Sequence, residues 1–126
     1  MRTELDQRMD AIMGAMTGEG GPLALGQCEH HGVAMPMIAT APPTLAAYFA
    51  HFCAQHAAAT FLVADDERIT FAETYAAAAR VARALVANHG VKRGDRVGIA
   101  MRNSPSWIAI YMGILLAGGV ATLLNG

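Results

Sequence analysis

Cysteine is scarce in this sequence. Only Cys28 and Cys53 occur, and they form no C-x-x-C pair. A disulfide-stapled scaffold and a zinc ribbon both need more cysteines at closer spacing, so the sequence supports neither. The N-terminus carries acidic residues and no continuous apolar stretch, which argues against a secretory signal. We therefore expect a protein of the reducing cytoplasm.

Charge is also in short supply. Nine Lys and Arg residues face ten Asp and Glu residues, the net charge is -1, and Lys92 is the only lysine. Binding to a phosphate backbone needs a basic patch, so we expect no nucleic-acid partner. Hydrophobic residues, in contrast, make up 54% of the chain. Typical soluble chains reach about 45–50% even with glycine counted, so this excess predicts surfaces that need covering.

One uncharged apolar run, from Trp107 to Leu124, is as long as a membrane span of about 18 residues. Gly118 and Gly119 divide it into a helix-like part, PSWIAIYMGILLA, and a β-branched part, VATLL. This division favours a buried helix followed by a buried strand. We expect no transmembrane span, and a membrane-associated protein using residues 107 to 124 is the third-ranked reading.

Three segments follow one another along the chain. Residues 1–17 form an N-terminal helix, because Leu5, Met9, Ile12, Met13 and Met16 recur at helical spacing before a glycine-rich stretch. Residues 18–43 form a linker and a β-hairpin, with strands at Leu23 to Cys28 and Val33 to Ile38 around the turn Glu29 to Gly32. Residues 44–126 form a partial α/β domain.

The partial domain begins with a helix that Thr44 caps. Its expected apolar face contains Leu45, Tyr48, Phe49, Phe52, Cys53 and His56. A second hairpin follows, with strands FLVA and RITF around Asp65, Asp66 and Glu67. Thr70 and Glu73 then form a capping box for a helix of about residues 71 to 89, and Gly90 suits its left-handed C-terminus.

The last three elements predict a βαβ unit. The run Arg96 to Met101 is a strand buried on both faces, Ser104 and Pro105 open a helix that reaches about Ala117, and Val120 to Leu124 is a second, parallel strand. The fold class is α/β: an incomplete βαβ sheet layer preceded by hairpins and helices. A strand that is apolar on both sides needs neighbours, which predicts a truncated domain or a homo-oligomer that completes the sheet.

Several constellations have both a functional and a structural interpretation. The possible zinc ligands are His51, Cys53, His56, Cys28, His30 and His31. Positions 51 and 53 lie about 200° apart on a helix, so they cannot converge on one ion. We expect Cys53 and His56 to pack in the core, His30 and His31 to occupy a solvated turn, and no metal site.

The remaining candidate site residues also have structural interpretations. Asp65, Asp66 and Glu67 are expected to form a solvated hairpin tip rather than a calcium site. Trp107 is expected to pack in its helix rather than stack on an adenine. The eight methionines suit either an acyl tunnel or an irregular core.

Three motifs at the right spacing carry a resemblance to a known family. They are Gly94-Asp95-Arg96-Val97, Asn103-Ser104-Pro105 and Ala117-Gly118-Gly119, within ITFAETYAAAARVARALVANHGVKRGDRVGIAMRNSPSWIAIYMGILLAGGV. This string resembles the first conserved core of adenylate-forming enzymes, which include acyl-CoA synthetases, luciferases and peptide-synthetase adenylation domains. The upstream order of hairpin, proline-rich link and helix resembles the fatty-acid-activating branch. The ending VATLLNG departs from the family, since prolines are common there where Leu123 and Gly126 stand.

The resemblance implies an AMP-forming acyl-CoA ligase that uses ATP, Mg²⁺ and coenzyme A. A carboxylate attacks the α-phosphate of ATP, and the thiol of coenzyme A then displaces AMP. The family's phosphate loop, its Tyr-Gly-x-Thr-Glu segment, its ribose-binding Asp and its C-terminal catalytic Lys have no counterpart here. Lys92 lies in a turn and does not replace the catalytic lysine. We therefore assign no catalytic, cofactor-binding or metal residue.

The leading hypothesis is that the chain is the N-terminal scaffold of such a ligase, inactive alone. Its partner would be the remainder of the enzyme or a second copy, bound through apolar strand and helix surfaces. The alternative hypothesis is a non-catalytic interaction or oligomerisation module derived from the same fold.

Overall fold

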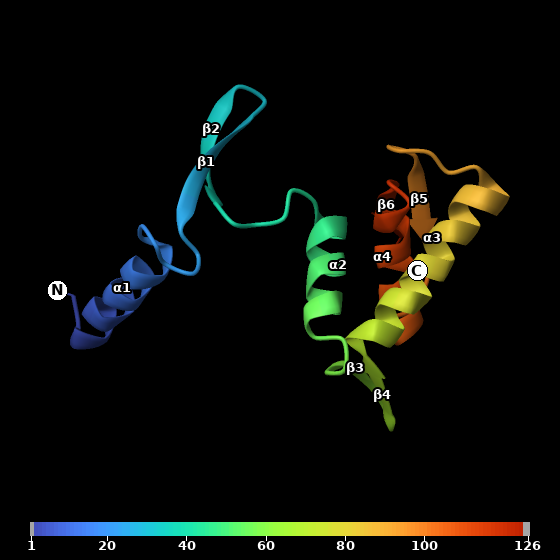
Figure 1. Cartoon of the computed structure of the whole chain (residues 1–126), viewed down its shortest axis with the longest axis horizontal. Coiled ribbons are helices and arrows are strands. Elements are labelled where there is room, and N and C mark those ends of the chain that lie inside the picture. Colours follow the sequence, from blue (N-terminus) through green and yellow to red (C-terminus); the bar gives the residue numbers. More distant parts are fainter. Residues whose placement is uncertain (1, 125–126) are drawn as a thin grey trace. The chain divides into compact units, whose positions relative to one another are not determined.

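The computed structural model describes residues 2–124, which divide into two compact units (Figure 1). Unit 1 is Met1–Pro42 and unit 2 is Pro43–Gly126. Unit 1 contains one helix and one hairpin. Unit 2 contains three helices and two small sheets.

Unit 1 begins with α1, Glu4–Thr17, and a capping box fixes its start. The Thr3 hydroxyl accepts a hydrogen bond from the Asp6 N–H at 3.2 Å, and the Asp6 carboxylate accepts one from the Thr3 N–H at 2.8 Å. These bonds hold the pKa of the Asp6 carboxyl below its ordinary value. The apolar face expected from the sequence is present but uncovered, since Leu5 is 66% exposed.

The unit 1 hairpin pairs β1, Leu25–His30, with β2, Val33–Ile38, in antiparallel fashion. His31 and Gly32 form a two-residue turn with φ values of 50° and 78°, which is typical of a type I′ turn. The predicted first strand, Leu23 to Cys28, was therefore displaced by two residues. The turn is so tight that His30 pairs directly with Val33 and belongs to the strand.

Unit 2 begins with α2, Leu45–Gln55, whose predicted cap is confirmed because the Thr44 hydroxyl accepts from the Ala47 N–H at 3.1 Å. The predicted hairpin is also present. It pairs β3, Thr60–Ala64, with β4, Glu67–Thr70. Asp65 and Asp66 alone form its turn, so Glu67 lies in the strand and not in the turn.

The long helix α3, Phe71–His89, has the bounds that the sequence predicts. The Thr70 hydroxyl accepts from the Glu73 N–H at 3.2 Å, and the Glu73 carboxylate accepts from the Thr70 N–H at 2.8 Å. Gly90 ends the helix with a φ of 64°, which a residue with a side chain rarely adopts. The capping box at Thr70 and Glu73 and the C-terminal glycine, Gly90, are therefore both confirmed.

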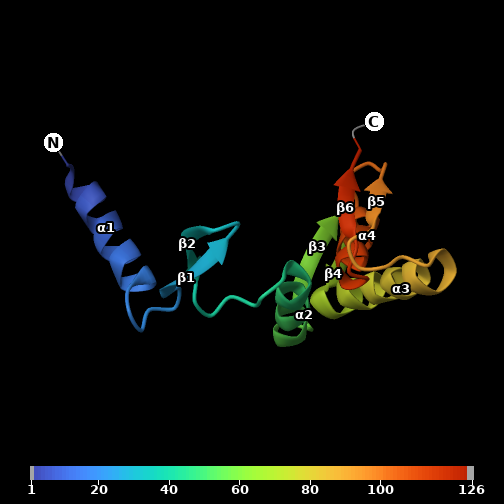
Figure 2. The same ribbon diagram turned by 90° about the horizontal axis from the view of Figure 1, so that it is seen from above.

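The βαβ unit consists of β5, Arg96–Ile99, α4, Pro105–Leu116, and β6, Val120–Leu123. The two strands are parallel, as predicted, and lie side by side in Figure 2. β5 is shorter than predicted, and only the side with Val97 and Ile99 is covered. Burial on both faces was therefore a wrong expectation, because among residues 2–124 no element covers the side of Gly98.

The core of unit 2 lies where α2, α3 and α4 meet. Phe49, Cys53 and Ala78 are buried there, and partly buried residues surround them, namely Phe61, Phe71, Met112 and Leu116. The predicted apolar face of α2 was too wide, since Leu45, Tyr48 and His56 are exposed. α2 contacts its neighbours along one side only, so the outer half of that face stays in solvent. No helix in residues 2–124 is long and apolar enough to cross a membrane.

Candidate functional site

The three sequence motifs form the two ends of the βαβ unit. At one end, the Asp95 carboxylate accepts from the Lys92 N–H at 2.8 Å and closes the turn before β5. The Gly94 N–H donates to the Gly118 carbonyl at 2.9 Å, and the Val120 N–H donates to the Asp95 carbonyl at 2.8 Å. These bonds fasten the turn before β5 to the turn before β6.

The glycine pair after α4 completes this junction. The Gly118 N–H donates to the Leu115 carbonyl at 3.0 Å, and the Gly119 N–H donates to the Ile114 carbonyl at 2.9 Å. With Gly118 at a φ of 82°, this pattern is a Schellman motif. The positive φ would strain any residue with a side chain here, although a Cβ would meet the Arg93 Cα at 3.4 Å, an ordinary contact distance. Gly118 and Gly119 thus turn the chain from α4 into β6.

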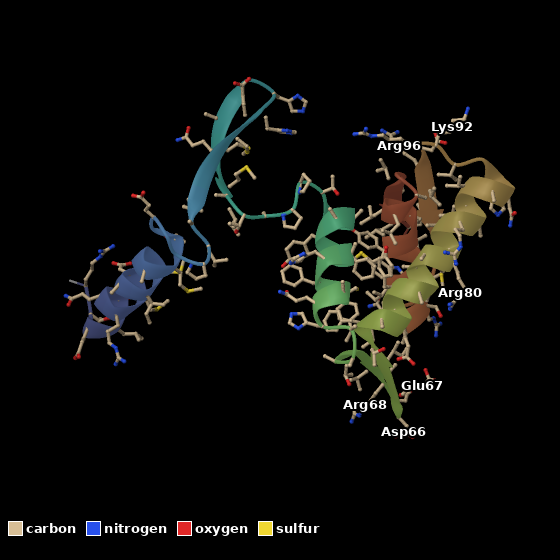
Figure 3. The ribbon with its side chains drawn as sticks, in the orientation of Figure 1. Asp66, Glu67, Arg68, Arg80, Lys92 and Arg96 are labelled. Carbon is tan, nitrogen blue, oxygen red and sulfur yellow. The ribbon has the colours of Figure 1, made fainter. Side chains whose placement is uncertain are left out.

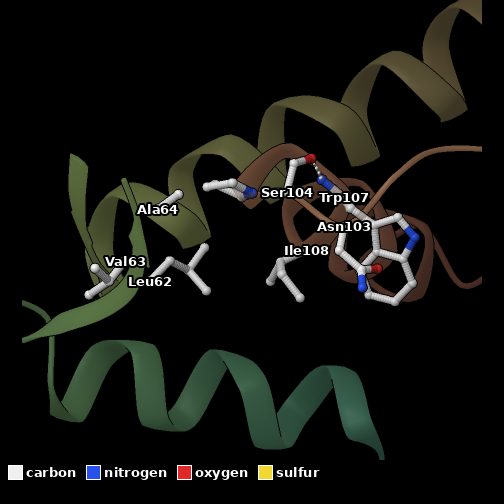
Figure 4. Close-up of a pocket in the computed structure, with 8 residues that line it drawn as sticks. Leu62, Val63, Ala64, Asn103, Ser104, Trp107 and Ile108 are labelled. Carbon is white, nitrogen blue, oxygen red and sulfur yellow. Dashed lines mark hydrogen bonds between the residues drawn. The ribbon is translucent and has the colours of Figure 1, made fainter. Parts of the chain in front are cut away.

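At the other end, the start of α4 forms one wall of an open hollow of about 500 Å³ (Figure 4). Leu62, Val63 and Ala64 of β3 form the opposite wall. The Ser104 hydroxyl accepts from the Trp107 N–H at 3.2 Å, which confirms the predicted cap. The hollow follows the carboxyl end of β5, the place where open α/β sheets bind ligands.

The ring of Trp107 lines this hollow and packs against Tyr111. The two ring centroids are 5.3 Å apart and the planes differ by 5°. Trp107 is half-buried, so it packs within its helix, as expected, while one edge faces the hollow. Ile108 and Leu62 complete an apolar floor.

Within residues 2–124, the hollow has neither the cations that a nucleoside triphosphate requires nor carboxylate ligands for its Mg²⁺. Its lining residues carry no titratable side chain, and the Ser104 hydroxyl is already bonded to the first turn of α4. Phosphate binding needs cations or several free amide donors, and Mg²⁺ needs oxygen ligands such as carboxylates. The hollow suits an apolar or aromatic group, or the side chains of another protein segment.

The charged residues named from the sequence lie elsewhere on the surface (Figure 3). Lys92 lies in the turn before β5 and Arg96 at the start of that strand, whereas Asp66 lies in the β3–β4 turn and Glu67 begins β4. Lys92 is exposed, and its backbone N–H rather than its ammonium group takes part in the turn. None of these side chains lines the hollow.

The histidines and cysteines named from the sequence do not form one cluster. Within residues 2–124, no three His, Cys, Asp or Glu side chains lie close enough to hold a metal ion together. Cys53 is buried as predicted, and burial raises the pKa of its thiol. His56 is exposed, contrary to prediction, because it caps the end of α2, where its ring stacks on Phe52 at 6.1 Å.

The sequence motifs identified the capped start of α4. They did not identify the strand that forms the opposite wall of the hollow. Leu62 to Ala64 belong to a hairpin far away in the chain, and no local pattern indicates which helix end such a strand will face. The only sequence signal was the apolar composition of that strand.

Comparisons with known proteins identify the family. The family model of the AMP-binding enzymes matches residues 49–126. That segment is more than half of the chain and contains all three motifs. The chain belongs to the AMP-binding enzyme family.

Curated relatives share the same segment. A 3-hydroxybenzoate/4-hydroxybenzoate–CoA ligase of Thauera aromatica is 44% identical over 66 residues, which are 52% of this chain and 12% of that enzyme. A medium/long-chain-fatty-acid–CoA ligase of Mycobacterium tuberculosis is 40% identical over 65 residues, which are 52% of this chain and 11% of that enzyme. The matched segment is thus about a tenth of the length of these relatives.

Solved structures show the same fold. The O-succinylbenzoate–CoA synthetase of Bacillus subtilis, in complex with AMP, aligns with a TM-score of 0.58 and 31% identity. The alignment covers 61% of this chain and 20% of that one. A benzoate–CoA ligase of Burkholderia xenovorans aligns with a TM-score of 0.59 and 29% identity, covering 64% and 16%. The α/β arrangement therefore matches the N-terminal domain of adenylate-forming enzymes.

Proposed function

We propose that this chain is the N-terminal scaffold of an ATP-dependent acid–thiol ligase. The complete enzyme would adenylate a carboxylic acid and transfer the acyl group to coenzyme A. The chain would contribute a sheet edge and the three helices of unit 2, and no catalytic, cofactor-binding or metal-binding side chain. Residues 44–126 would be the scaffold proper, residues 1–17 an N-terminal helix and residues 18–43 a linker with a hairpin. A cytoplasmic location is part of the proposal, and the free thiols Cys28 and Cys53 support it.

One observation carries this proposal. The family motifs build a parallel βαβ unit, yet the side of the sheet opposite α4 is bare within residues 2–124. Val120 on that side is 47% exposed, and Leu124, which follows β6 on the same side, is 53% exposed. Parallel sheets normally have both faces covered, so this side is suited to packing against further parts of the enzyme.

A chimera tests the scaffold role. Residues 49–124 would replace the equivalent segment of the Burkholderia xenovorans benzoate–CoA ligase, and benzoate-dependent ATP–pyrophosphate exchange would be measured. We expect the chimera to catalyse exchange and the chain alone to show none. Exchange by the chain alone, or a folded chimera without activity, would contradict the proposal.

The acid substrate needs a separate test. We expect a fatty acid, an expectation that the similarity to the Mycobacterium tuberculosis ligase supports and the similarity to the Thauera aromatica ligase opposes. The coding DNA beyond residue 126 should first be read for a phosphate loop and a Tyr-Gly-x-Thr-Glu segment. The encoded enzyme would then be assayed with fatty and aromatic acids, and a higher kcat/KM for the aromatic acids would refute the fatty-acid assignment.

The second candidate function is an interaction module. The bare sheet side and the uncovered apolar face of α1 favour it, because exposed apolar surface of this kind is typical of docking sites. Sedimentation of the chain alone distinguishes the two candidates. A discrete, stable oligomer would support the module, and a monomer would support the scaffold.

A further inference from the structure

The two edges of the β1–β2 hairpin differ in their free backbone groups. The two-residue turn makes His30 and Val33 a hydrogen-bonded pair, and at the other end the Ala39 N–H donates to the Ala24 carbonyl at 2.8 Å. Hydrogen-bonded and non-hydrogen-bonded pairs alternate along an antiparallel ladder. The register between these ends contains no bulge, so it fixes which residues turn their backbone groups outward.

The outer edge of β2 is blocked. Its outward-facing residues are Ala34, Pro36 and Ile38. Pro36 has no N–H to donate, and the Ile38 carbonyl already accepts from the Ala41 N–H at 3.1 Å. Proline on an outer strand is one of the ways in which proteins prevent a sheet from gaining another strand. β2 therefore offers no continuous edge to a further strand.

The outer edge of β1 is open. Leu25, Gln27 and Glu29 turn their N–H and carbonyl groups away from β2, and within residues 2–124 no backbone group outside the hairpin bonds to them. β1 contains no proline, lysine or bulge, the usual features that protect an edge. The side chains of these residues are exposed, so another strand can reach the edge. An isolated two-stranded hairpin is at best marginally stable in water, and additional strands stabilise it.

We propose that β1 pairs antiparallel with β1 of a second copy of this chain, giving a four-stranded sheet with the order β2–β1–β1–β2. A two-fold axis at the centre of the strand would place Gln27 opposite Gln27 of the partner subunit. It would place Leu25 opposite Glu29 of the partner subunit. Each of these outward-facing residues would exchange both of its backbone hydrogen bonds with the residue opposite it.

The blocked edge of β2 favours a second copy over another extended segment. Both outer strands of the paired sheet would be β2, so assembly would stop at two chains instead of extending into a filament. The charges also agree with this register. Glu29 carries the only carboxylate of β1, and the two Glu29 side chains of the dimer would lie about 13 Å apart along the strands. That separation exceeds the Debye length of about 8 Å at physiological salt, so their repulsion is screened.

The contact belongs to unit 1 and is independent of the proposed ligase scaffold. The family model begins at residue 49, beyond the hairpin, and the strand pairing uses no residue of unit 2. A dimer formed in this way is therefore no evidence for the interaction module described above. The choice between scaffold and module is made by sedimentation of Gln27→Pro, in which the bare sheet side and α1 are unchanged.

Sedimentation of the full chain over a range of concentrations tests the proposal. We expect a monomer–dimer equilibrium. Gln27→Pro removes the central outward N–H from both copies and should raise the Kd of the dimer at least about tenfold, since each lost bond leaves a carbonyl without its donor. Ala34→Pro is the matched control, because it removes an outward N–H from the blocked edge and should leave the Kd unchanged. A monomeric unchanged chain, an equal loss in both variants, or no loss in Gln27→Pro would overturn the proposal.

Disulfide formation between copies decides the matter even if a proline loosens the hairpin. The proposed register places position 26 opposite Cys28 of the partner subunit, at a non-hydrogen-bonded pair, where side chains are closest. Gly26→Cys in a Cys53→Ala chain should therefore give a disulfide-linked dimer when oxidised glutathione is added. Positions 26 and 28 of one chain lie about 6.6 Å apart, too far for a disulfide within the chain. A Cβ at position 26 would meet Ala39 at 3.4 Å, so the added side chain fits.

Ala34→Cys in the same Cys53→Ala chain is the control for this experiment. Its thiol lies on the other face of the hairpin and on the blocked edge, so it should give no linked dimer. A gel without reducing agent measures both variants. A linked dimer from Gly26→Cys alone would support the register, whereas no linked dimer from it, or as much from Ala34→Cys, would overturn it.

Discussion

At the scale of single residues, the start of α3 depends on two side chains that hold each other. Thr70 and Glu73 exchange hydrogen bonds in both directions, and Thr70 also joins β4 to the helix without an intervening loop. The same box occurs at Thr3 and Asp6 in α1. A buried threonine, Thr74, donates its hydroxyl to the Thr70 carbonyl at 2.9 Å, so the junction has no unsatisfied buried polar group.

Removing the cap should weaken unit 2. Thr70→Ala deletes the hydroxyl that accepts from the Glu73 N–H, and loss of such a cap costs about 1 kcal/mol. Urea denaturation followed by circular dichroism would measure the change. Thr122→Ala is the control, because this threonine is exposed and caps no helix. An equal loss of stability in both variants would mean that the Thr70 cap adds no stability of its own.

The Glu73 carboxylate should make stability depend on pH. The backbone N–H and hydroxyl of Thr70 hold its pKa below the ordinary value of 4.5. The carboxylate therefore stabilises the fold fully above pH 4.5, and this contribution is lost as the pH falls through the lower, folded pKa. With Glu73→Gln, the melting temperature should fall less steeply as the pH drops below 4.5. Thr122→Ala, which changes no titratable group, should leave that fall unchanged.

At the scale of elements, α4 packs closely on α3 at one glycine. A Cβ on Gly113 would lie 2.7 Å from the Cβ of Val81 and 2.9 Å from the Ala78 carbonyl oxygen. Real side chains do not approach so closely, so the two helices can keep this distance only because residue 113 is glycine. Ile114, next to it, has no exposed surface.

Gly113→Ala should therefore destabilise unit 2. Alanine favours a helix over glycine by about 1 kcal/mol, but overpacking costs about 1–3 kcal/mol, and we expect the second effect to exceed the first. The double variant Val81→Ala with Gly113→Ala should recover part of the loss in urea denaturation. Gly14→Ala is the matched control, since nothing lies within 4 Å of its Cβ. It should raise helical content, and a gain from Gly113→Ala as well would contradict the packing argument.

The sequence predicted the ends of the helices better than the contacts that the helices make. Local signals such as Thr70 with Glu73, Gly90 and Ser104 with Pro105 gave helix ends that the structure confirms. His56 and Tyr48 were misplaced because helical spacing defines a face but not how much of it a neighbour covers. His30 was misplaced because a positive φ at His31 made the turn shorter than its polar residues indicated. The hollow beside Trp107 depends on a distant strand and could not be predicted locally.

At the scale of the whole molecule, the two sides of the β5–β6 pair differ. Val97, Ile99 and Ala121 lie on the covered side, and Arg96, Gly98 and Val120 lie on the bare side. Leu124 partly shields Gly98, because its Cδ1 would lie 3.3 Å from a Cβ there. Substitutions at neighbouring positions of one strand therefore test opposite sides of the sheet.

Two neighbouring lysine substitutions should behave differently in the chain alone. Val120→Lys changes an exposed residue, and its stability should stay within about 0.5 kcal/mol of the unchanged chain. Ala121→Lys places an ammonium group on the covered side and should cost at least about 2 kcal/mol. Urea denaturation measures both. In the benzoate–CoA ligase chimera, Val120→Lys should also abolish exchange activity, and full activity there would mean that the bare side stays uncovered in the enzyme.

The glycine at position 113 also limits how the chain can search for its fold. If α4 shifted by one residue along α3, Met112 or Ile114 would face Val81, where even a methyl group is too large. At this helix spacing, the clash blocks a one-residue shift and so disfavours that competing arrangement. Fewer competing ways to dock should leave fewer kinetic traps when the helix pair folds.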